Sequence, residues 1–342
     1  MKVRCGIGLD IGGTHISAVA LDQRCKEASD VLCSSERAVT DRDVETVVGL
    51  IVECLIEVHG KLAEAYGDEF EISGIGFGVP GNVDPTLGTT RYLPNFQWLE
   101  TVPLKDLVLK KLFSSGSLFG HCDASRVRVE MRNDGRCAAI AEFVFGYGKD
   151  CDGISVFSML TLGTGIGGAV IINGKLFDGA SFDAGDFGHH VIRSGEGAMP
   201  CACGKAGCFE THASAQGLVR LYNRLPGAEK CCTGPDGRGH DALGVLKKLR
   251  AGDAVAALAF ETYADDLSSG LANLVTFYNP NVIVLGGGFG QAEELYVGDE
   301  IQRRVDAKSL PATRGKMKVV RAVLGGGAGA LGAALLALGR GV

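Results

Sequence analysis

Glycine-rich turns follow apolar, β-prone runs at several separate places in this chain, and that pattern restricts the fold more than any other feature. The predicted strands Val3–Leu9 and His15–Leu21 flank a Gly12-Gly13 turn, which indicates a β-hairpin. The predicted strands Ile154–Leu162 and Ala169–Ile172 flank a second glycine turn in the same way. Two rounds of strand, glycine turn and strand, each followed by helical patterns, predict a duplicated α/β fold with a mixed sheet in each half.

Hydrophobic periodicity indicates the remaining elements. Helices are predicted at Val44–Tyr66, Pro103–Phe113, Ala138–Phe145, Ala213–Leu225, Val255–Tyr278 and Ala328–Leu338, and strands at Ile72–Val79, Val127–Met131 and Asn281–Leu285. We expect a smaller N-terminal α/β domain at 1–131, completed by the C-terminal helix at 328–342, and a larger α/β domain at 132–327. The ligand is expected in the cleft between the two halves.

Composition excludes several classes of protein. The 342 residues carry a net charge of −6, which provides no basic field for nucleic acid or an anionic membrane surface. The most apolar tract, at residues 328–338, is too short and too rich in glycine and alanine to span a bilayer. The first residues run directly into a predicted strand without a signal-peptide pattern, so a cytoplasmic location is expected.

One histidine and three cysteines lie close together in a glycine-rich segment. His189 is followed by Cys201, Cys203 and Cys208, and two acidic residues, Asp186 and Glu210, bracket the group. Thiolate and imidazole are the ligands of closed tetrahedral zinc sites, and the intervening glycines allow the backbone to bring the cysteines together. The segment therefore predicts a zinc site that fixes acidic residues at the rim of a cleft.

The first glycine turn carries the sequence Asp10-Ile11-Gly12-Gly13-Thr14. Glycine allows backbone N–H groups to approach phosphate oxygens, and the carboxylate beside them implies a bridging Mg²⁺. The second turn, at residues 163–168, fits the spacing G-x-G-x-x-G of dinucleotide-binding proteins, but a strand follows it where that motif requires a helix. We therefore interpret the two turns as a pair of phosphate-binding hairpins.

Polar residues at the ends of predicted strands are candidates for sugar chemistry. Asn133-Asp134 stands between a strand and a helix, where a carboxylate either caps the helix or acts as a general base that aligns a substrate hydroxyl for attack on a γ-phosphate. Asn82 and Asn95 lie in a loop with Trp98, and amides both donate to and accept from sugar hydroxyls. Ordinary loop polarity and a partly buried tryptophan are the alternative for that loop.

In order along nearly the whole chain, these motifs resemble the ROK family of sugar kinases and sugar-responsive repressors. The resemblance is carried by Asp10–Thr14, Gly78–Gly81 with Pro94-Asn95, Asn133-Asp134 with Glu142, Leu162–Gly168, Gly185–His189 with Cys201–Glu210, and Ile283–Gly288. It implies an actin-like, hexokinase-type duplicated fold, ATP and Mg²⁺ as cofactors, and a structural Zn²⁺. It further implies that Asp134 is the catalytic base.

The resemblance also assigns the other site residues. Sugar binding is implied for Gly81, Asn82, Asn95, Asn133, Asp186, His189 and Glu210; ATP or phosphate binding for Asp10, Gly12, Gly13, Thr14, Gly163, Thr164, Gly165, Gly286, Gly287 and Gly288; and zinc ligation for His189, Cys201, Cys203 and Cys208. Asp10 would hold Mg²⁺ through water. The partners implied are a hexose and ATP, with the chain as a homodimer.

Three positions depart from the family pattern. Asp186 stands where the family usually has glutamate, which shortens the side chain toward the sugar by one methylene. His15 replaces a common lysine after the first hairpin turn. His190 follows His189 directly, so either histidine could be the zinc ligand by position, and the spacing from Asp186 and the Gly188 turn favours His189.

Two classes of function are weighed. An ATP-dependent hexose kinase is favoured, with glucose as the first acceptor; fructose, mannose, allose, N-acetylglucosamine and N-acetylmannosamine are the alternatives, and polyphosphate is an alternative donor. The second class is a non-catalytic sugar sensor or repressor. A repressor would need a helix-turn-helix before the first hairpin, where only nine residues precede Asp10.

Overall fold

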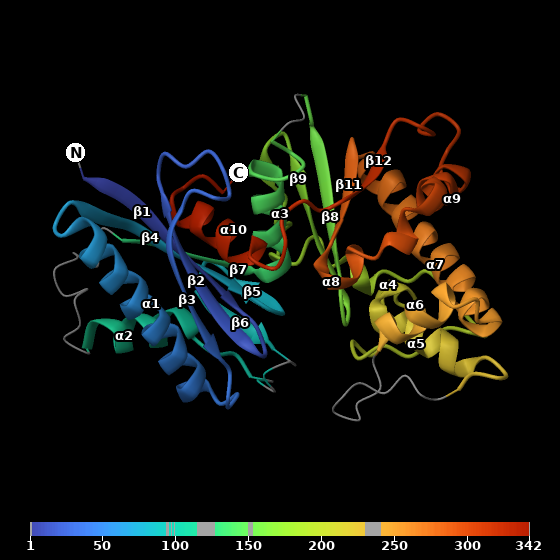
Figure 1. Ribbon diagram of the computed structural model, residues 1–342, viewed down its shortest axis with the longest axis horizontal. Coiled ribbons are helices and arrows are strands. Elements are labelled where there is room, and N and C mark those ends of the chain that lie inside the picture. The colour runs from blue at the N-terminus through green and yellow to red at the C-terminus, as the bar shows by residue number, and fades with distance from the viewer. Residues whose placement is uncertain are drawn as a thin grey trace. The chain divides into compact units, whose positions relative to one another are not determined.

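The computed structural model describes residues 2–93, 96, 98, 100–114, 127–149, 153–229 and 241–341. The chain divides into two compact units. The first combines residues 1–152, 174–184 and 323–342, and the second combines residues 153–173 and 185–322 (Figure 1). None of the described helices is long and apolar enough to cross a membrane.

The first unit is built on a five-stranded mixed sheet of order β3-β2-β1-β4-β7. Its strands are β1 (Val3–Ile11), β2 (His15–Asp22), β3 (Val31–Ala38), β4 (Phe70–Val79) and β7 (Arg128–Asn133). The hairpin of β1 and β2 and the pair β2–β3 are antiparallel, whereas β1, β4 and β7 run parallel to one another. The predicted hairpin is thus confirmed, and its first strand continues into a parallel half of the sheet.

Helix α1 (Val44–Tyr66) covers one face of this sheet, and its bounds are those predicted from the sequence. Asp43 caps the helix by accepting a hydrogen bond from the Thr46 amide at 2.9 Å. Side chains that alternate along β1 and β4, such as Ile7 and Phe77, join the buried face of α1 in one apolar core. The apolar stripe of α1 is therefore buried because the strands present large side chains toward it.

On the opposite face of the sheet, β1 and β4 present glycines instead of large side chains. Added Cβ atoms at Gly8 and Gly76 would lie 2.1 Å and 1.9 Å from the backbone oxygens of Ala330 and Ala333. These alanines belong to α10 (Ala328–Ala337), a helix of small and apolar residues that is buried along its whole length. Because neither surface carries bulky side chains, the helix backbone lies directly on the strands.

Shorter elements complete the first unit: β5 (Asn82–Asp84), β6 (Thr89–Tyr92), α2 (Leu104–Ser114) and α3 (Asp134–Val144). β5 and β6 pair antiparallel to each other. Helix α3 packs against α10, and an added Cβ at Gly332 of α10 would lie 1.7 Å from the Cys137 carbonyl oxygen of α3. The two helices therefore make a second close backbone contact beside the sheet.

The other five-stranded mixed sheet has the order β10-β9-β8-β11-β12, and all of its strands except β10 belong to the second unit. Its strands are β8 (Val156–Leu162), β9 (Ile166–Ile172), β10 (Lys175–Leu176), β11 (Val282–Gly286) and β12 (Lys318–Arg321). β8 and β9 form the second predicted hairpin, and β8, β11 and β12 are parallel. Asn173 and Gly174 both have positive φ, at 50° and 71°, as a type I′ turn requires.

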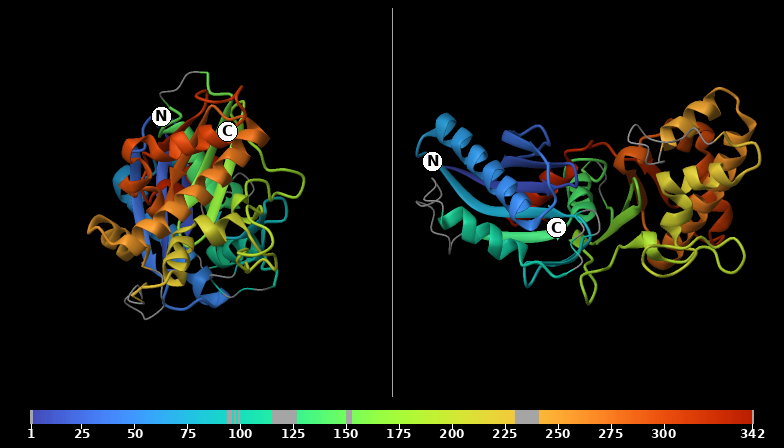
Figure 2. Two further views of the ribbon diagram at one scale, coloured as in Figure 1. Left: turned by 90° about the vertical axis from the view of Figure 1, so that its right-hand side faces the viewer. Right: turned by 90° about the horizontal axis from the view of Figure 1, so that it is seen from below.

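Helices α4 (Phe209–Ala213), α5 (Ala215–Arg224), α6 (Ala242–Arg250), α7 (Ala254–Tyr278) and α9 (Glu300–Lys308) lie together on one side of the second sheet (Figures 1 and 2). Large side chains from the sheet, including Leu160, Ile283 and Leu285, share one apolar core with Leu267, Leu271 and other residues of these helices. A four-residue helix, α8 (Gly287–Gly290), follows β11.

The structure confirms the duplicated α/β architecture and most predicted elements, and it adds several that the sequence reading did not predict: β3, β5, β6, β10, β12, α6, α8 and α9. Helix α3 begins at Asp134, four residues before the predicted start. The expected domain boundary after residue 131 would assign α3 to the second domain, whereas α3 packs within the first unit. The division into independent domains stays a prediction.

Candidate functional site

The parallel strands of the first unit bring several predicted site residues to one edge of its sheet. Asp10 near the end of β1 lies opposite Gly78 in β4, and Val79 of β4 lies opposite Asn133 of β7. Gly81 and Asn82 follow β4 directly. Because the carboxyl ends of parallel strands meet at one edge, residues far apart in the sequence gather there, as at the ligand sites of other α/β sheets.

Asn133 and Asp134 occupy the turn from β7 into α3. Asn133 is the N-cap of α3, since its Oδ1 accepts a hydrogen bond from the Arg136 amide at 3.3 Å. Its Nδ2 donates to the Gly81 carbonyl at 3.1 Å. Asp134 is the first residue of the helix and accepts from the Gly135 amide at 2.8 Å. Asn133 therefore caps the helix. The Asp134 carboxylate lies beside it at the helix N-terminus, where negative charge is stabilised.

Asp10 is strongly affected by its surroundings. Burial, and then the negative charge of Asp134, raise the pKa of the Asp10 carboxyl to about 7. Two carboxylates that repel each other in a buried site favour a cation, because a positive charge allows both groups to ionise. Carboxylates and water are the ligands that Mg²⁺ prefers, so the donor set at Asp10 fits the ion implied by the sequence.

The first phosphate hairpin turns tightly at residues 12–14. The Gly12 amide donates to the His15 carbonyl at 2.9 Å, and an added Cβ at Gly12 would lie 2.9 Å from that same oxygen. Thr14 Oγ1 lies 3.2 Å from His15 Nδ1, so the histidine at the usual lysine position contacts the turn hydroxyl. Gly12, Gly13 and Thr14 are thus presented together beside Asp10.

The structure adds two contacts that the sequence reading missed. Asn82 Nδ2 donates to Asp183 Oδ1 at 2.7 Å. Arg136, buried in the first turn of α3, donates to the carbonyls of Phe182 and Ala184. These bonds fix residues 182–184, which directly precede the Gly185–His189 motif. The one feature of the sequence that could have indicated the Arg136 contacts is an arginine among the small residues at the start of α3.

The loop after β5 and β6 is described only in part. Asn95 lies outside the described residues, so its role in sugar binding stays a prediction. Trp98 is buried, and its Nε1 donates to the Arg42 carbonyl at 2.6 Å. This agrees with the alternative of a structural tryptophan.

In the second unit, the predicted metal ligands converge. One ligand atom from each of His189, Cys201, Cys203 and Cys208 lies within 4.8 Å of the other three. The Sγ atoms of Cys203 and Cys208 are 3.6 Å apart, and Cys201 Sγ lies 3.7 Å from His189 Nδ1. A tetrahedral site with bonds of about 2.3 Å has ligand atoms about 3.8 Å apart, so the donor set and its spacing fit zinc.

His190, the next residue after His189, packs into the surrounding structure instead of joining the cysteine cluster. His190 Nδ1 lies 2.6 Å from the Phe187 carbonyl, and its ring packs 5.0 Å from the ring of Phe209. Burial lowers the pKa of His190. His189, in contrast, is the histidine in the cluster with the three cysteines, which is the choice that the spacing favoured.

Glu210 connects the metal cluster to the second glycine hairpin. Its Oε1 lies 3.6 Å from His189 Nδ1 and 3.3 Å from Cys201 Sγ. An added Cβ at Gly165 would lie 2.6 Å from Glu210 Oε2, so the end of the Glu210 side chain lies directly against the hairpin at this glycine. Asp186 precedes the single-turn helix at Phe187–His189, and its carbonyl accepts from the His189 amide at 3.1 Å.

The second phosphate hairpin and the Gly286–Gly288 segment lie at the same edge of the second sheet. Leu285 and Gly286 of β11 are opposite Leu160 and Thr161 of β8, in parallel register. Gly287 has φ of 76°, and an added Cβ would lie 2.5 Å from the Leu162 carbonyl oxygen. The Gly163 carbonyl accepts from the Ala215 amide at 3.0 Å, which ties the turn to the start of α5.

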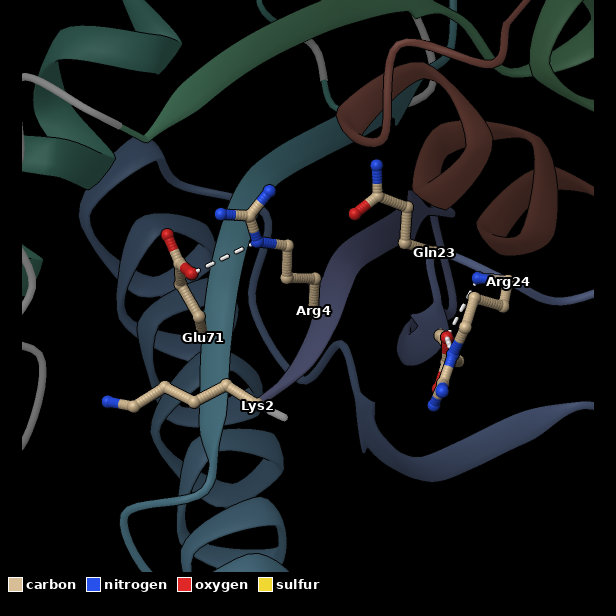
Figure 3. Close-up of a pocket in the computed structure, with 6 residues that line it drawn as sticks. Lys2, Arg4, Gln23, Arg24 and Glu71 are labelled. Atoms are coloured by element: carbon tan, nitrogen blue, oxygen red, sulfur yellow. Dashed lines mark hydrogen bonds and ion pairs between the residues drawn. The ribbon is translucent and has the colours of Figure 1, made fainter.

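A cavity of about 500 Å³ lies elsewhere, at the opposite end of β1 from Asp10 (Figure 3). It is lined by Lys2, Arg4, Asp22, Gln23, Arg24 and Glu71. Its acids already pair with its arginines, with Arg4 Nε 3.2 Å from Glu71 and Arg24 Nη2 2.8 Å from Asp22. None of the predicted site residues contributes to it.

The predicted residues thus form two groups. In the first unit the structure gathers Asp10, Gly12, Gly13, Thr14, Gly81, Asn82, Asn133 and Asp134; in the second it gathers Gly163, Thr164, Gly165, Asp186, His189, Cys201, Cys203, Cys208, Glu210, Gly286, Gly287 and Gly288. Each group is assembled within its own unit by strand ends, hairpin turns and the cysteine loop.

Comparison with known proteins agrees with these motifs. A family model described as the ROK family matches residues 6–340. The chain is 30% identical to a glucokinase of Thermotoga maritima, over 96% of this chain and 95% of that protein. It is 29% identical to an N-acetyl-D-glucosamine kinase of Vibrio vulnificus, over 96% and 98% of the two chains. A solved ROK family glucokinase of Streptomyces griseus, in complex with glucose and AMPPNP, is 31% identical, covers 97% of this chain and 98% of its own, and superposes with a TM-score of 0.73.

Proposed function

The chain belongs to the ROK family, and from that premise we propose that it transfers the γ-phosphate of ATP to the primary hydroxyl of a hexose, with glucose as the first substrate to test. Its relatives include a glucokinase and an N-acetyl-D-glucosamine kinase, and one related structure holds glucose and an ATP analogue. These names support a sugar kinase, and the identity of the sugar is part of the proposal.

The pair of carboxylates at the strand ends of the first unit is the observation that supports the reaction best. Asp134 stands at the N-terminus of α3, beside the capping Asn133. As general base, it would accept the proton of the sugar hydroxyl as the oxygen attacks the γ-phosphorus, while the bond to the β-phosphate oxygen breaks and ADP leaves. Asn133 would hold the acceptor hydroxyl in line.

Asp10 would hold the magnesium ion through water, and that ion would neutralise charge on the transferred phosphate. The raised pKa of Asp10 supports this role, because a carboxyl with a pKa of about 7 is only partly ionised at neutral pH, and a bound cation would offset both burial and the charge of Asp134. The tight turn at Gly12, Gly13 and Thr14 offers backbone N–H groups to phosphate oxygens.

The same proposal assigns the remaining residues. Sugar hydroxyls would be bound by Gly81, Asn82, Asp186, His189 and Glu210, with Asn95 as a further candidate. Residues 163–165 and 286–288 would bind the nucleotide. The four-ligand cluster would hold a structural zinc ion, which would keep His189 and Glu210 in place for the sugar.

A kinase for an N-acetylhexosamine is the second candidate, and the Vibrio vulnificus relative favours it over the other sugars. Asp186, shorter than the usual glutamate, is the residue whose reach differs most from the family pattern. Polyphosphate as donor, a homodimer and a cytoplasmic location stay predictions.

The decisive experiment measures ADP release with Mg²⁺-ATP and a panel of hexoses and N-acetylhexosamines for the wild type, Asp134→Asn and Asp106→Asn. Asp106 lies in the first turn of α2 and provides a matched carboxylate outside the site. Asp134→Asn should lower kcat by about 10²- to 10⁴-fold while calorimetry still detects sugar binding. Near-normal turnover of that variant would remove Asp134 as the base. Sugar binding without turnover by the wild type would favour a sensor.

A further inference from the structure

A buried aspartate in the second unit lies beside both ends of the cysteine loop, which is the segment between Arg193 and His212. Asp266 belongs to α7, and only 4% of its side chain is exposed. Its neighbours in the helix, such as Leu267, are core residues. A buried carboxylate needs partners, because an unpaired charge in the interior is strongly unfavourable. Two residues beside its carboxylate come from the segment that carries the metal ligands: Arg193, which forms hydrogen bonds to it, and His212, whose Nδ1 lies 3.6 Å away.

The first partner precedes the loop. Arg193 donates through Nε and Nη2 to Asp266 Oδ1, each at 2.7 Å. The Arg193 backbone lies against Gly207, the residue before Cys208. The Arg193 amide donates to the Gly207 carbonyl at 3.3 Å, and an added Cβ at Gly207 would lie 1.8 Å from the Arg193 carbonyl oxygen. Fixing Arg193 therefore fixes the backbone next to a metal ligand.

The second partner follows the loop. His212 is buried, and its Nε2 accepts a hydrogen bond from the Met199 amide at 3.3 Å. The proton of the neutral ring must then lie on Nδ1, which faces Asp266 Oδ2 at 3.6 Å. Burial, and then nearby arginine charges, lower the pKa of His212 to about 4, consistent with a neutral ring. The Met199 carbonyl in turn accepts from the Gly207 amide at 2.8 Å.

We propose that Asp266, Arg193 and His212 form a clamp that holds the cysteine loop in its ligating geometry independently of the metal. The clamp is defined by these three side chains. The loop contains Gly195, Gly197, Gly204 and Gly207 at positive φ, so ordering it costs much conformational entropy. By anchoring both ends of the loop to α7, the clamp reduces the disorder that metal binding would otherwise have to remove. All three are positioning residues, and the inference rests on the proposed zinc site.

The neighbouring aspartate provides a matched control. Asp265 also lies on α7, but it faces α9, where Lys308 Nζ donates to its Oδ1 at 2.6 Å. Asp266→Asn and Asp265→Asn are therefore the same change on adjacent residues, one inside the clamp and one outside it. At His212, His212→Leu removes the acceptor for the Met199 amide, whereas the side-chain oxygen of His212→Gln can replace it.

The first measurement is the rate at which zinc-loaded protein releases zinc to an excess of a coloured chelator. Asp266→Asn and His212→Leu should release zinc about tenfold faster than wild type, which is the lower end of the range for residues that support metal ligands. Asp265→Asn should match wild type, and His212→Gln should restore most of the retention. Equal rates in all variants would overturn the clamp.

The second measurement uses metal-stripped protein and therefore separates the clamp from the zinc proposal. Amide hydrogen exchange at residues 199–208 should be about tenfold faster in Asp266→Asn and His212→Leu, with exchange in β8 unchanged as a test that the second unit is folded. If wild type binds no zinc, the zinc proposal fails while this experiment still tests the clamp. If Asp266→Asn or His212→Leu loses protection throughout the second unit, His212→Gln provides the test, because it keeps the acceptor for the Met199 amide. If the second unit of His212→Gln is folded but its loop amides are unprotected, the clamp is contradicted.

Discussion

The two sheets have the same strand order but are packed by opposite means. In each, an antiparallel hairpin leads into parallel strands, in the orders β3-β2-β1-β4-β7 and β10-β9-β8-β11-β12. In the first sheet, the part of β1 and β4 that faces α10 carries glycines, and Gly8 and Gly76 meet the helix backbone there. The second sheet offers its helices large side chains such as Leu160 and Leu285. One topology is thus stabilised by close backbone approach in one unit and by side-chain interdigitation in the other.

The difference teaches that strand order does not determine which substitutions a sheet tolerates. Where backbones touch, adding one carbon is the damaging change. Where side chains fill the space, removing carbons is the damaging change, because a cavity remains. The contact between the glycines of the first sheet and α10 should therefore be damaged by small-to-large substitution, and the side-chain core of the second sheet by large-to-small substitution. Three substitutions test this contrast, and a fourth prediction concerns the charge of Asp10.

Gly76→Ala should have the largest effect. The added Cβ would lie 1.9 Å from the Ala333 oxygen, so α10 must move off the sheet. We expect a loss of about 4 kcal/mol in the free energy of unfolding of the first unit, at the upper end of what single substitutions cause. Hydrogen exchange of β1 and β4 peptides measures this loss, with second-unit peptides as the internal control. Unchanged protection in β4 would mean that the close contact is absent in solution.

Leu285→Ala should cause the next largest effect, now confined to the second unit. Leu285 is completely buried in the core shared by β11 and the helices. Truncation leaves a cavity and should cost about 3 kcal/mol. Exchange of β8 and β11 peptides should accelerate while β1 and β4 stay protected. Equal acceleration in both units would indicate that they unfold together and would break the comparison.

The raised pKa of Asp10 predicts a pH dependence that belongs to the first unit. The folded pKa is about 7 and the reference value is 3.8, so between these values the native state retains a proton that the unfolded chain releases. Stability is therefore lost as the pH rises through this window, by up to about 1.4 kcal/mol per pH unit. Above about pH 7 the loss is complete, and below about pH 4 it vanishes.

Asp10→Asn removes this titration. With EDTA present, the variant should gain about 2 kcal/mol over wild type between pH 5.5 and 7. Urea unfolding at several pH values, followed by exchange of β1 peptides, measures the gain. The exposed Asp106→Asn serves as the control and should run parallel to wild type. A difference between Asp10→Asn and wild type that does not change with pH would contradict the assigned shift.

Gly60→Ala should have the smallest effect, and its sign should be opposite to that of Gly76→Ala. Gly60 lies inside α1, and no atom lies within 4 Å of its added Cβ. Alanine is favoured over glycine in a helix interior by about 1 kcal/mol, so the first unit should become slightly more stable. Thermal unfolding measures the gain in stability. Destabilisation would show that α1 does not tolerate an added methyl group even where no atom lies near it.

Some of the fold followed from the sequence because the signals were local. Helix α1 has strong apolar periodicity and a capping aspartate, and its predicted bounds match the structure. Strand β3 was missed because its sequence, Val31–Ala38, is half polar and lies at the sheet edge, held by pairing with β2. Helix α9 was missed because only Ile301 and Val305 are buried, which leaves too little apolar pattern to recognise.

The candidate site divides in the same way. The hairpin turns and the cysteine spacing are short-range motifs, so they could be predicted as groups. Contacts that depend on tertiary structure could not: Asn82 meets Asp183, and Asp266 meets Arg193 and His212, with no sequence pattern to relate them. The effect of Asp134 on Asp10 likewise depends on the register of three strands.

The packing of α10 on β1 has a consequence for biosynthesis. Strand β1 begins at Val3, whereas the helix that covers its glycine face begins only at Ala328, so the strand is made well before the helix. The second unit ends before Val323, so all of its residues emerge from the ribosome before this helix does. Since domains can fold as soon as their residues are available, the second unit can fold first. The first unit, which contains β1, is then completed after the second.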